Sequence, residues 1–567
     1  MIGAVLGLPR AETEARLVSL VGACSNSRVA VRQSSGLVAA GTDTLADSGA
    51  EAWVGRPRSG HTRGGKAHLQ GDFSLISIDG DDELSLTRGF FGGRPLFYTR
   101  STSDRSLTVC SGLTPLVTTL SGLTLDRERL ASFVLKRPLR DHGRTFYRQI
   151  RRAPSASVLR VGADGVRAQI AMPLTPVRPS EETVDGLAAE LREYVRAAVR
   201  RSMAGAVRVG VSTSGGLDSS YLLATAMALA REENRPDVGA FNLRFAGAGD
   251  DRPHFDRLCK ALGVVPYSFE PREYSGLLEN AFVADSAPLA GPTSAFDIGM
   301  TRLAAERGVT AFMTGMGGDE FLTGDMGVFG ERAMAGHVVW AIRAAATLKA
   351  WGNSTVRTRL QTLVLRPIIR SFAPTLGRRT QEVPWAGPLL RKFEAEEIFE
   401  DRRMALGFAG PNGLETLARS AQLMDYSDIR GQLEVAGSCQ RIDPYMDEDL
   451  LGFVSAVDPE ILFHEGWVRG LFRHAIRGEV PESIRLRSDK ASFEPALVEL
   501  ISAAGGFGVL EALVRMNGLA DLGLVEPRAF RQRFDELVAC PEDGRLWVEL
   551  WPVLAAEAFV RGTAAQA

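Results

Sequence analysis

The segment 214–220 holds the residues whose types and spacing are best suited to chemistry. It reads Ser-Gly-Gly-Leu-Asp-Ser-Ser and follows a run of alternating valines, which predicts a short buried strand. The apolar residues after it predict a helix. A strand that turns through glycines into a helix places backbone N–H groups and the positive end of the helix dipole around an anion. The segment therefore predicts a phosphate-binding loop, to which Ser214, Ser219 and Ser220 add hydroxyl donors.

Asp218 lies inside this loop and has the same sign of charge as a phosphate. A carboxylate beside phosphates normally binds Mg²⁺, so we predict that Asp218 is a metal ligand. The GxxxxGK[ST] pattern of the common P-loop is absent here, and no lysine follows the glycines. The loop therefore belongs to another class of nucleotide site.

A second glycine-rich turn follows a predicted strand about a hundred residues later. Residues 315–320 read Gly-Met-Gly-Gly-Asp-Glu, after an apolar run that begins near Val309. A Gly-Asp turn is a weak signal by itself. Its position at the end of another strand makes Asp319 a second candidate for the same site, because ligands of parallel sheets bind at the carboxyl ends of the strands.

The composition predicts a multidomain globular protein. The chain has 567 residues, of which 45% are hydrophobic and 24% are charged, and a net charge of −2. That charge argues against broad nucleic-acid binding. The five cysteines are scattered without a CxxC pair, so neither a zinc site nor a redox pair is indicated. With no signal peptide and no membrane span recognised, we expect a cytoplasmic location.

Residues 1–172 predict a β-rich region. Alternating apolar and polar residues around the turn 79–82 predict a hairpin, and segments 108–116 and 156–161 predict further short strands. A helix is predicted over 125–136. Three prolines in the segment that follows predict a linker to the next region.

Residues 180–520 predict a second, α/β region. Strand, helix and strand patterns alternate after the phosphate loop, which favours a parallel sheet with helices on both faces. Most of the stretch 327–440 predicts helices, and its basic amphipathic part at 356–370 is interpreted as a solvated helix face. Residues 521–567 predict a helical C-terminal extension.

Both glycine-rich turns resemble motifs of one enzyme superfamily. Ser214–Ser220 resembles the pyrophosphate loop of the N-type ATP pyrophosphatases, and Thr314–Glu320 resembles the SGxGxDE motif of the asparagine synthetases. The order of segments over 71–116 resembles the glutaminase domain of the same synthetases. The resemblance implies a degenerate Ntn-hydrolase-like domain over 1–172 and an adenine-nucleotide α-hydrolase-like synthetase domain over 180–520.

This resemblance also implies a set of ligands and cofactors. Asp218 and Asp319 would share Mg²⁺, and Leu243 would fall at the adenine. The predicted ATP-binding residues are Thr213, Ser214, Gly215, Gly216, Asp218, Ser219, Ser220, Leu243, Thr314 and Gly315. ATP would be cleaved to AMP and pyrophosphate as a carboxylate is activated as its adenylate.

Lys490 is the predicted catalytic cation, beside the two aspartates. The segment up to Phe493 resembles the RxKxxF motif of asparagine synthetases and β-lactam synthetases, and residues 444–447 resemble PFLD. Arg487 and Arg441 each lie one residue further upstream than these patterns ask. In the resembling enzymes the lysine stabilises charge that develops during adenylation and acyl transfer, an effect worth several kcal/mol in a closed site. Lys490 is one of only six lysines among 66 basic residues, so its presence inside this motif favours a functional role.

The N-terminal region departs from the resembling family at one important position. In the glutaminase domains the second residue is a cysteine whose freed N-terminus completes the amidohydrolase site. Here that position is Ile2, whose side chain has no nucleophile. We therefore expect a domain that keeps the fold and has lost glutamine hydrolysis.

The acceptor amine separates three interpretations. An asparagine synthetase needs ammonia, whose usual supply Ile2 removes. A β-lactam synthetase places a catalytic tyrosine near the position of Met316, and methionine is no general base. A lasso peptide macrolactam synthetase (lasso cyclase) adenylates an Asp or Glu side chain of a precursor peptide, whose own N-terminal amine attacks because the folded peptide holds the two groups together.

We favour the lasso cyclase, because the segment at Gly466-Trp467 and the long helical region are most similar to that group. Its partners would be a precursor peptide, a leader peptidase and a leader-recognition protein. The general base is unassigned, with Asp285, Asp297 and Glu320 as candidates. Two other classes stay open, which are a tRNA-modifying ATP pyrophosphatase and a non-catalytic scaffold.

Overall fold

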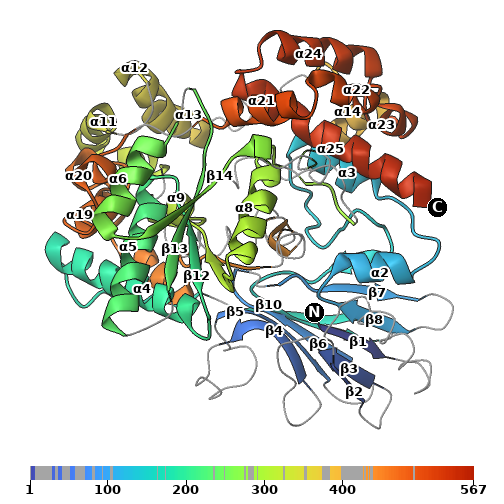
Figure 1. The fold of residues 1–567 in the computed structure, drawn as a ribbon, viewed down its shortest axis with the longest axis horizontal. Helices are drawn as coiled ribbons and strands as arrows, with labels where there is room; N and C mark the ends of the chain where they lie inside the picture. Colours follow the sequence, from blue (N-terminus) through green and yellow to red (C-terminus); the bar gives the residue numbers. More distant parts are fainter. Residues whose placement is uncertain are drawn as a thin grey trace.

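The computed structural model describes most of the chain beyond residue 70 and four strands before it (Figure 1). The described residues are 2–6, 28–31, 36–40, 51–57, 71–78, 83–91, 94–101, 106–162, 164–172, 174–233, 237–247, 250–273, 276, 278, 286–289, 291–323, 326–349, 354–372, 383–396, 426, 429–431, 433, 439–488 and 492–566. The predicted turn 79–82, Asp285 and Lys490 lie outside these residues.

Two antiparallel sheets form the N-terminal part. One has the order β2-β3-β1-β8-β7-β9 and consists of β1 (Ile2–Leu6), β2 (Arg28–Val31), β3 (Gly36–Ala40), β7 (Phe97–Arg100), β8 (Leu107–Cys110) and β9 (Ile150–Arg152). The other has the order β11-β10-β6-β5-β4 and consists of β4 (Glu51–Pro57), β5 (Gly71–Ile78), β6 (Glu83–Arg88), β10 (Ser157–Gly162) and β11 (Gly165–Ala171). Alternate residues of both sheets, such as Ile76 and Val109, share one buried cluster.

The strand predicted over 108–116 is only partly correct. The strand β8 ends at Cys110, and helix α2 (Leu113–Thr119) follows it. Pro115 lies in the first turn of α2, where its missing N–H would have no partner within the helix. The predicted helix over 125–136 is confirmed as α3 (Arg127–Leu135).

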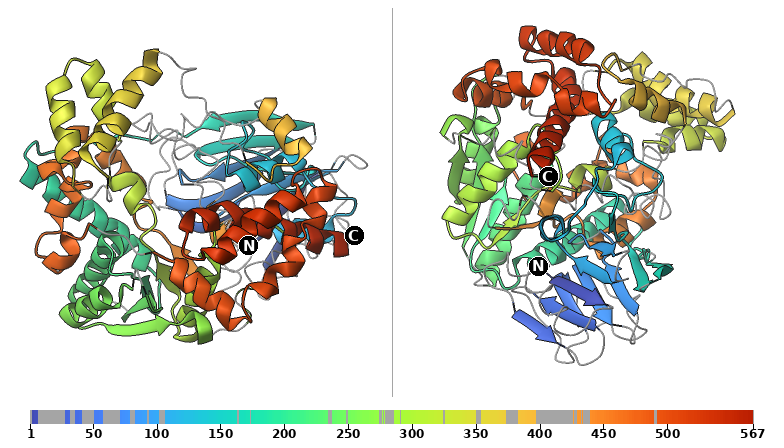
Figure 2. Two further views of the ribbon diagram at one scale, coloured as in Figure 1. Left: turned by 90° about the horizontal axis from the view of Figure 1, so that it is seen from above. Right: turned by 90° about the vertical axis from the view of Figure 1, so that its right-hand side faces the viewer.

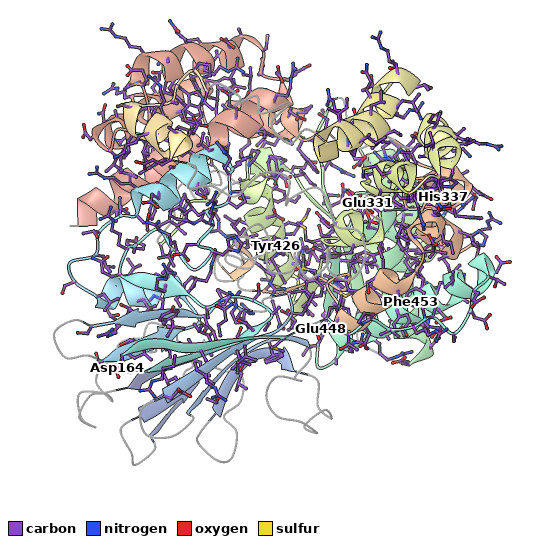
Figure 3. The ribbon with its side chains drawn as sticks, turned by 180° about the vertical axis from the view of Figure 1, so that it is seen from behind. Asp164, Glu331, His337, Tyr426, Glu448 and Phe453 are labelled. Carbon is purple, nitrogen blue, oxygen red and sulfur yellow. The ribbon has the colours of Figure 1, made fainter. Side chains whose placement is uncertain are left out.

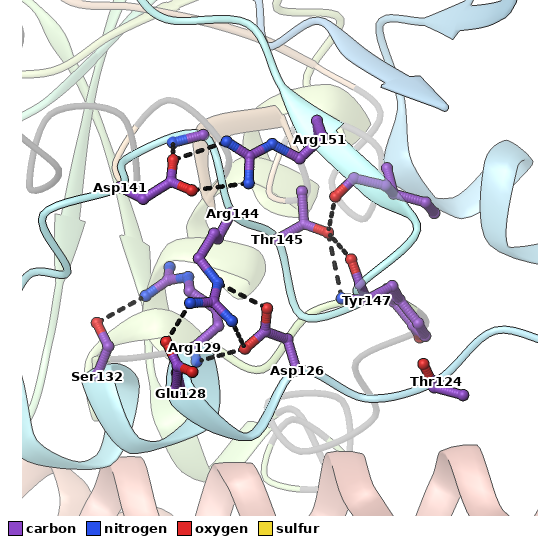
Figure 4. Close-up of polar contacts among 12 residues, drawn as sticks. Thr124, Asp126, Glu128, Arg129, Ser132, Asp141, Arg144, Thr145, Tyr147 and Arg151 are labelled. Carbon is purple, nitrogen blue, oxygen red and sulfur yellow. Dashed lines mark hydrogen bonds and ion pairs between the residues drawn. The ribbon is translucent and has the colours of Figure 1, made fainter. Parts of the chain in front are cut away.

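Polar contacts organise the loops around α3 (Figure 4). Asp126 caps the helix, because its carboxylate accepts the Arg129 N–H at 3.0 Å. Arg144 binds the same carboxylate through Nε at 2.8 Å and also pairs with Glu128. The Thr145 hydroxyl donates to the carbonyl of Tyr147 at 3.0 Å. These groups bind one another and so hold the loop against the helix.

A parallel five-stranded sheet forms the centre of the second region, as predicted. Its order is β14-β13-β12-β15-β16, built from β12 (Val209–Ser212), β13 (Val238–Leu243), β14 (Val265–Phe269), β15 (Ala311–Met313) and β16 (Gln440–Ile442). The helices that accompany it are α4 (Val184–Met203), α5 (Leu217–Glu232), α6 (Arg252–Leu262) and α8 (Ser294–Glu306), with the 3₁₀ turn η2 (Pro271–Glu273) after β14. The parallel register brings the carboxyl ends of β12, β13 and β15 to one edge.

Most of the remaining described residues are in helices (Figures 1 and 2). A first group is α9 (Gly318–Leu322), α10 (Val328–Met334), α11 (Val338–Thr347), α12 (Val356–Arg359), η3 (Leu360–Leu365), α13 (Arg366–Phe372) and α14 (Pro388–Ala395). A second group is α17 (Glu448–Ala456), α18 (Pro459–Leu462), η5 (His464–Gly466), α19 (Gly470–Ala475), α20 (Glu482–Arg485), α21 (Glu494–Ala503), η6 (Phe507–Leu510), α22 (Glu511–Val514), α23 (Asn517–Asp521), α24 (Pro527–Ala539) and α25 (Gly544–Gln566).

The last helix returns to the N-terminal part. In both figures α25 lies beside α3, and the ring of Phe559 meets those of Phe146 and Tyr147 at centroid distances of 5.5 and 6.0 Å. Among the described residues no single helix is long and apolar enough to cross a membrane, although the helices 494–503 and 507–521 pass that test as a pair bent by 85°.

A small apolar cluster joins the two regions. Phe90 and Phe91, which follow β6, pack with Phe321 of α9 and Leu451 of α17. The rings of Phe91 and Phe321 lie 5.3 Å apart. The backbone N–H of Gly71 also donates to the Glu448 carboxylate at 3.0 Å. The N-terminal sheets therefore contact the helices that follow both β15 and β16.

Candidate nucleotide site

The segment 213–216 forms a tight loop between β12 and α5, as the sequence predicts. Thr213 is tied to the neighbouring strand, because its N–H donates to the Phe241 carbonyl at 2.7 Å and its carbonyl accepts from the Asn242 amide at 2.9 Å. Gly215 has φ of +70°, and a Cβ there would lie 2.6 Å from Cβ of His254. Only glycine meets both demands. Gly216 is the N-cap of α5, so the free N–H groups of that helix face the loop.

A pocket of about 470 Å³ opens at this loop. Its lining includes polar groups from the loop and from the segment 469–487, and the apolar side chains of Leu243, Phe245, Phe296 and Met300. The arrangement of a phosphate loop beside apolar side chains matches the two chemical parts of a nucleotide.

Asp218 and Asp319 approach the same guanidinium group in this pocket. Arg469 Nη1 lies 2.5 Å from Oδ2 of Asp218 and 3.0 Å from Oδ1 of Asp319. Arg469 has a left-handed backbone with φ of 60°, which is unusual outside glycine, and it is the N-cap of α19. The structure thus brings together the two carboxylates that the sequence predicted as partners, and it adds an arginine between them.

The carboxyl of Asp218 is poised to bind a cation. Burial raises its pKa above the ordinary value, and the charge of Asp319 acts in the same direction, while Arg469 opposes both. Oδ1 of Asp218 is buried and has no hydrogen-bond partner among the described residues. A divalent ion bound by one or two carboxylates plus phosphate oxygens is the usual Mg²⁺ arrangement. The donor set of Asp218 and Asp319 therefore fits Mg²⁺ held together with a nucleotide.

The second glycine turn is seated directly against the first. A Cβ at Gly318 would lie 2.6 Å from Cγ of Asp218, and one at Gly315 would lie 3.3 Å from the Ser219 nitrogen. Gly317 has φ of +91° and is the N-cap of α9. Because three glycines allow this approach, the turn can carry Asp319 to the edge of the pocket.

Two arginines complete the polar wall of the pocket. Arg487 is buried, pairs with Asp251 at 2.5 Å and donates to the Gly215 carbonyl at 3.3 Å. Arg473 donates to the carbonyls of Val468 and Arg487. Burial, followed by the positive charge of Arg469, lowers the pKa of Arg473 to about 10. A phosphate group near these cations would relieve their mutual repulsion.

Most of the predicted ATP ligands line this pocket, and three do not. The predicted ATP ligands that line it are Thr213, Ser214, Gly216, Asp218, Ser219, Leu243 and Gly315, and the predicted metal ligand Asp319 lines it as well. Gly215 contributes its turn and its carbonyl, and the hydroxyl of Ser220 is buried without a partner among the described residues. The Thr314 hydroxyl instead donates to Asp443 at 2.5 Å. Lys490 lies outside the described residues, so its role stays a prediction.

Several pocket residues were not predicted from the sequence. Arg469, Arg473 and Asn242 line the pocket but were not predicted as site residues. The signal available for the arginines was the four-residue spacing of Arg469, Arg473 and Arg477. The apolar members Phe245, Phe296 and Met300 have no sequence signal that distinguishes them from core.

The structure distinguishes two of the three base candidates. Asp297 lines the pocket, and its Oδ1 is held at 3.0 Å by buried Arg441. Glu320 instead accepts the Gly317 N–H at 3.1 Å as part of the N-terminal cap of α9. Burial raises the pKa of Glu320. Asp297 is therefore placed for contact with a ligand, and Glu320 is placed to hold the turn.

Two family models match parts of this chain. A family model described as asparagine synthase matches residues 190–561, and one described as a glutamine amidotransferase domain matches residues 59–170. A curated relative, asparagine synthetase [glutamine-hydrolyzing] 1 of Bacillus subtilis (strain 168), is 24% identical over 450 residues, which are 73% of this chain and 66% of the relative, just under two thirds of its length.

A similarity to a solved structure is much weaker. It is the glutamine phosphoribosylpyrophosphate amidotransferase from B. subtilis complexed with ADP and GMP, at 10% identity and a TM-score of 0.21. The match covers 50% of this chain and 84% of the other.

Proposed function

This chain belongs to the asparagine synthase family, and we propose that it is an ATP-dependent carbon–nitrogen ligase that closes a peptide into a macrolactam as a lasso cyclase. Members of the family use ATP, usually with Mg²⁺. In the proposed reaction an Asp or Glu side-chain carboxylate of a precursor peptide attacks the α-phosphate of ATP and pyrophosphate leaves. The peptide's own N-terminal amine then attacks the acyl-adenylate and AMP leaves.

The isoleucine at position 2, where the glutaminase domains have their nucleophilic cysteine, is the observation that carries the proposal. Ile2 begins β1, the strand that would present the cysteine. Among the described cysteines, Cys110 is buried on β8 opposite Gly3 of β1. Burial raises the pKa of Cys259 to about 12 and that of Cys439 to about 11, so neither of these two is a ready thiolate. Without ammonia from glutamine, an amine carried by the substrate becomes the natural acceptor.

The residues of the pocket can be given roles in this reaction. The loop 213–216 and the start of α5 would bind the phosphates through N–H and hydroxyl groups. Mg²⁺, when bound to Asp218 and Asp319, would neutralise charge on the leaving pyrophosphate. Arg469 would then exchange its carboxylate partners for phosphate oxygens. Lys490 would stabilise the charge on the α-phosphate and on the tetrahedral intermediate.

The position of Asp297 in the pocket makes it the first candidate for the base that accepts the proton of the attacking amine. Met316, which is partly exposed at the second turn, has no basic group for that task. Met316 therefore disfavours the β-lactam synthetase alternative, as it did in the sequence analysis.

Product analysis with a matched pair of peptides tests the proposal. One peptide has a free N-terminus and an internal Asp or Glu, and the other is identical but N-terminally acetylated. We expect AMP, pyrophosphate and a peptide lighter by one water from the first peptide alone. The acetylated peptide should give no cyclic product because its amine is blocked.

Two other outcomes would replace the proposal. Asparagine formed from aspartate and ammonia, with no dehydrated product from any peptide, would establish the activity named for the B. subtilis relative. Glutamate released from glutamine would contradict the inferred loss of the glutaminase. The Asp218→Asn variant serves as the control for nucleotide hydrolysis by contaminants.

A further inference from the structure

A chain of charged side chains connects the N-terminal sheets to the second glycine turn. Asp72 on β5 accepts from Arg430 Nη2 at 2.9 Å, and Nη1 of Arg430 lies 3.3 Å from Oδ2 of Asp443. Oδ1 of Asp443 accepts from the Thr314 hydroxyl at 2.5 Å. The side chain of Arg430 is 5% exposed and that of Asp443 is 0% exposed, so the ion pair between them lies in the protein interior.

The groups in this chain keep the charges and donors that the contacts require. Tyr426 adds a hydroxyl that donates to Oδ2 of Asp443 at 2.9 Å. Burial raises the pKa of Tyr426 well above its ordinary value, and Asp443 adds to this effect, so the hydroxyl stays protonated. Burial lowers the pKa of Arg430, but the carboxylates of Asp72 and Asp443 outweigh it and the net shift is upward.

Asp443 lies beside the end of β15. Two residues, Ile442 and Asp443, separate Arg441 from Pro444, where the expected pattern has one. Asp443 follows β16, whose carbonyl at Ile442 accepts the Thr314 N–H at 3.0 Å. Its carboxylate therefore lies where the second turn begins.

Thr314 transmits this contact to the pocket. Its hydroxyl donates to Asp443 and also accepts the Met316 N–H at 3.3 Å, so it holds the first residues of the turn. The same turn packs Gly315 and Gly318 against Ser219 and Asp218. A displacement of Thr314 would move Asp319 relative to Asp218.

We propose that Asp72 is a positioning residue for nucleotide binding, by which the N-terminal domain holds the Thr314–Asp319 turn in register with the phosphate loop. The domain then has a role in the ligase reaction without a nucleophile of its own. The inference rests on the ATP-binding part of the proposed function and does not depend on a peptide substrate.

A second contact between the same two regions provides the matched control. Gly71 directly precedes Asp72, and its N–H donates to Glu448 of α17. Figure 3 labels Glu448 and Tyr426. Glu448 lies in the first turn of α17, after β16. Loss of that contact should loosen the domain junction to a similar degree without displacing the turn.

The test is calorimetric titration of each full-length variant with ATP in excess Mg²⁺, with no peptide present. We expect Asp72→Asn to weaken ATP binding roughly tenfold, since the negative charge that pairs with Arg430 is lost. Asp72→Glu should recover most of the affinity. Glu448→Gln should bind ATP as the wild type does, at a comparable melting temperature.

Tyr426→Phe keeps the test decisive should Asp72→Asn fail to fold. It removes one donor to Asp443 while leaving both regions and their apolar contacts intact, and we expect a loss of affinity of about threefold. Wild-type ATP affinity in both Asp72→Asn and Tyr426→Phe would overturn the proposal. An equal loss in Asp72→Asn and Glu448→Gln would also overturn it, because the effect would then belong to the junction in general. Because no peptide is present, failure of this inference would leave the proposed peptide cyclisation untouched, and the acetylated-peptide experiment tests that proposal by itself.

Discussion

The loops around α3 and the loops around the parallel sheet contain similar residues but use them differently. In the first region Asp126, Glu128 and Arg144 bind one another, and the network closes on itself. In the second, Oδ1 of Asp218 and Oγ of Ser220 are buried without a partner among the described residues. A buried polar atom left unsatisfied costs stability unless a ligand supplies the missing partner. The comparison favours a structural role for the charged side chains around α3 and a ligand-binding role for those around the phosphate loop.

Asp218→Asn should produce the largest effect. The amide keeps the shape of the side chain but removes the charge that Mg²⁺ requires, so we expect AMP release to fall by a factor of about 10³ or more. Quantified AMP from purified protein checks this. Wild-type turnover in this variant would show that Asp218 is not needed for the reaction and would contradict a ligand site at the phosphate loop.

Phe559→Ala should destabilise the chain without altering the pocket. Phe559 is 2% exposed and contacts Phe146 and Tyr147, so the substitution leaves a cavity between α25 and the N-terminal part. We expect the free energy of unfolding to fall by about 3–5 kcal/mol. Denaturant titration measures the loss, and an ATP affinity unchanged in the folded variant would sharpen the contrast between support and site.

Lys490→Ala tests the predicted catalytic cation. We expect kcat to fall by about 10²–10³-fold with little change in KM for ATP, because the lysine is proposed to act on charge that develops during the reaction. Lys392→Ala is the matched control, since Lys392 is 64% exposed on α14 and pairs only weakly with Glu396 at 3.6 Å. Equal activity of both variants would withdraw Lys490 from the mechanism.

Asp141→Asn should have the smallest effect, in the region whose charges are satisfied. Partial burial raises the pKa of Asp141, but its hydrogen bonds and ion pair with Arg151 outweigh this and hold the pKa below its ordinary value. A lowered pKa means that the pair stabilises the protein above about pH 4 and that this contribution disappears as the pH falls through the folded-state pKa.

We therefore expect the variant to be less stable than the wild type by under about 1 kcal/mol at neutral pH, given the exposure of both side chains. Urea titrations between neutral pH and about pH 3 should show the difference shrinking as the acid protonates Asp141. A difference that grew towards low pH would contradict the assigned sign.

Local patterns carried much of the fold. The valines before residue 214 and the glycines within the loop predicted a strand, turn and helix that the structure has, because alternation and missing Cβ atoms act over a few residues. The strand expected over 108–116 was wrong beyond Cys110, since Leu113 and Leu116 are compatible with either a strand or a buried helical face. That choice depends on what packs against them.

Contacts between distant segments could not be predicted in the same way. Arg469 lies 251 residues from Asp218, and Arg430 lies 358 residues from Asp72, so no local period relates them. The placement of α25 on α3 is a further example, because the apolar residues of α25 predict burial but do not say where. Each of these contacts forms only when separate elements meet in space.

The sequence by itself determined the elements and the chemistry that each can perform, since strand alternation, helix capping, turn glycines and the charge of a carboxylate are properties of neighbouring residues. Only the tertiary structure decided which of those groups share a site. It brought Asp218, Asp319 and Arg469 together, assigned the Thr314 hydroxyl to Asp443 and connected Asp443 to Asp72. The physical reason is that hydrogen bonds and ion pairs act over a few ångströms, a range that only the packing of sheets and helices can bring about between residues hundreds of positions apart.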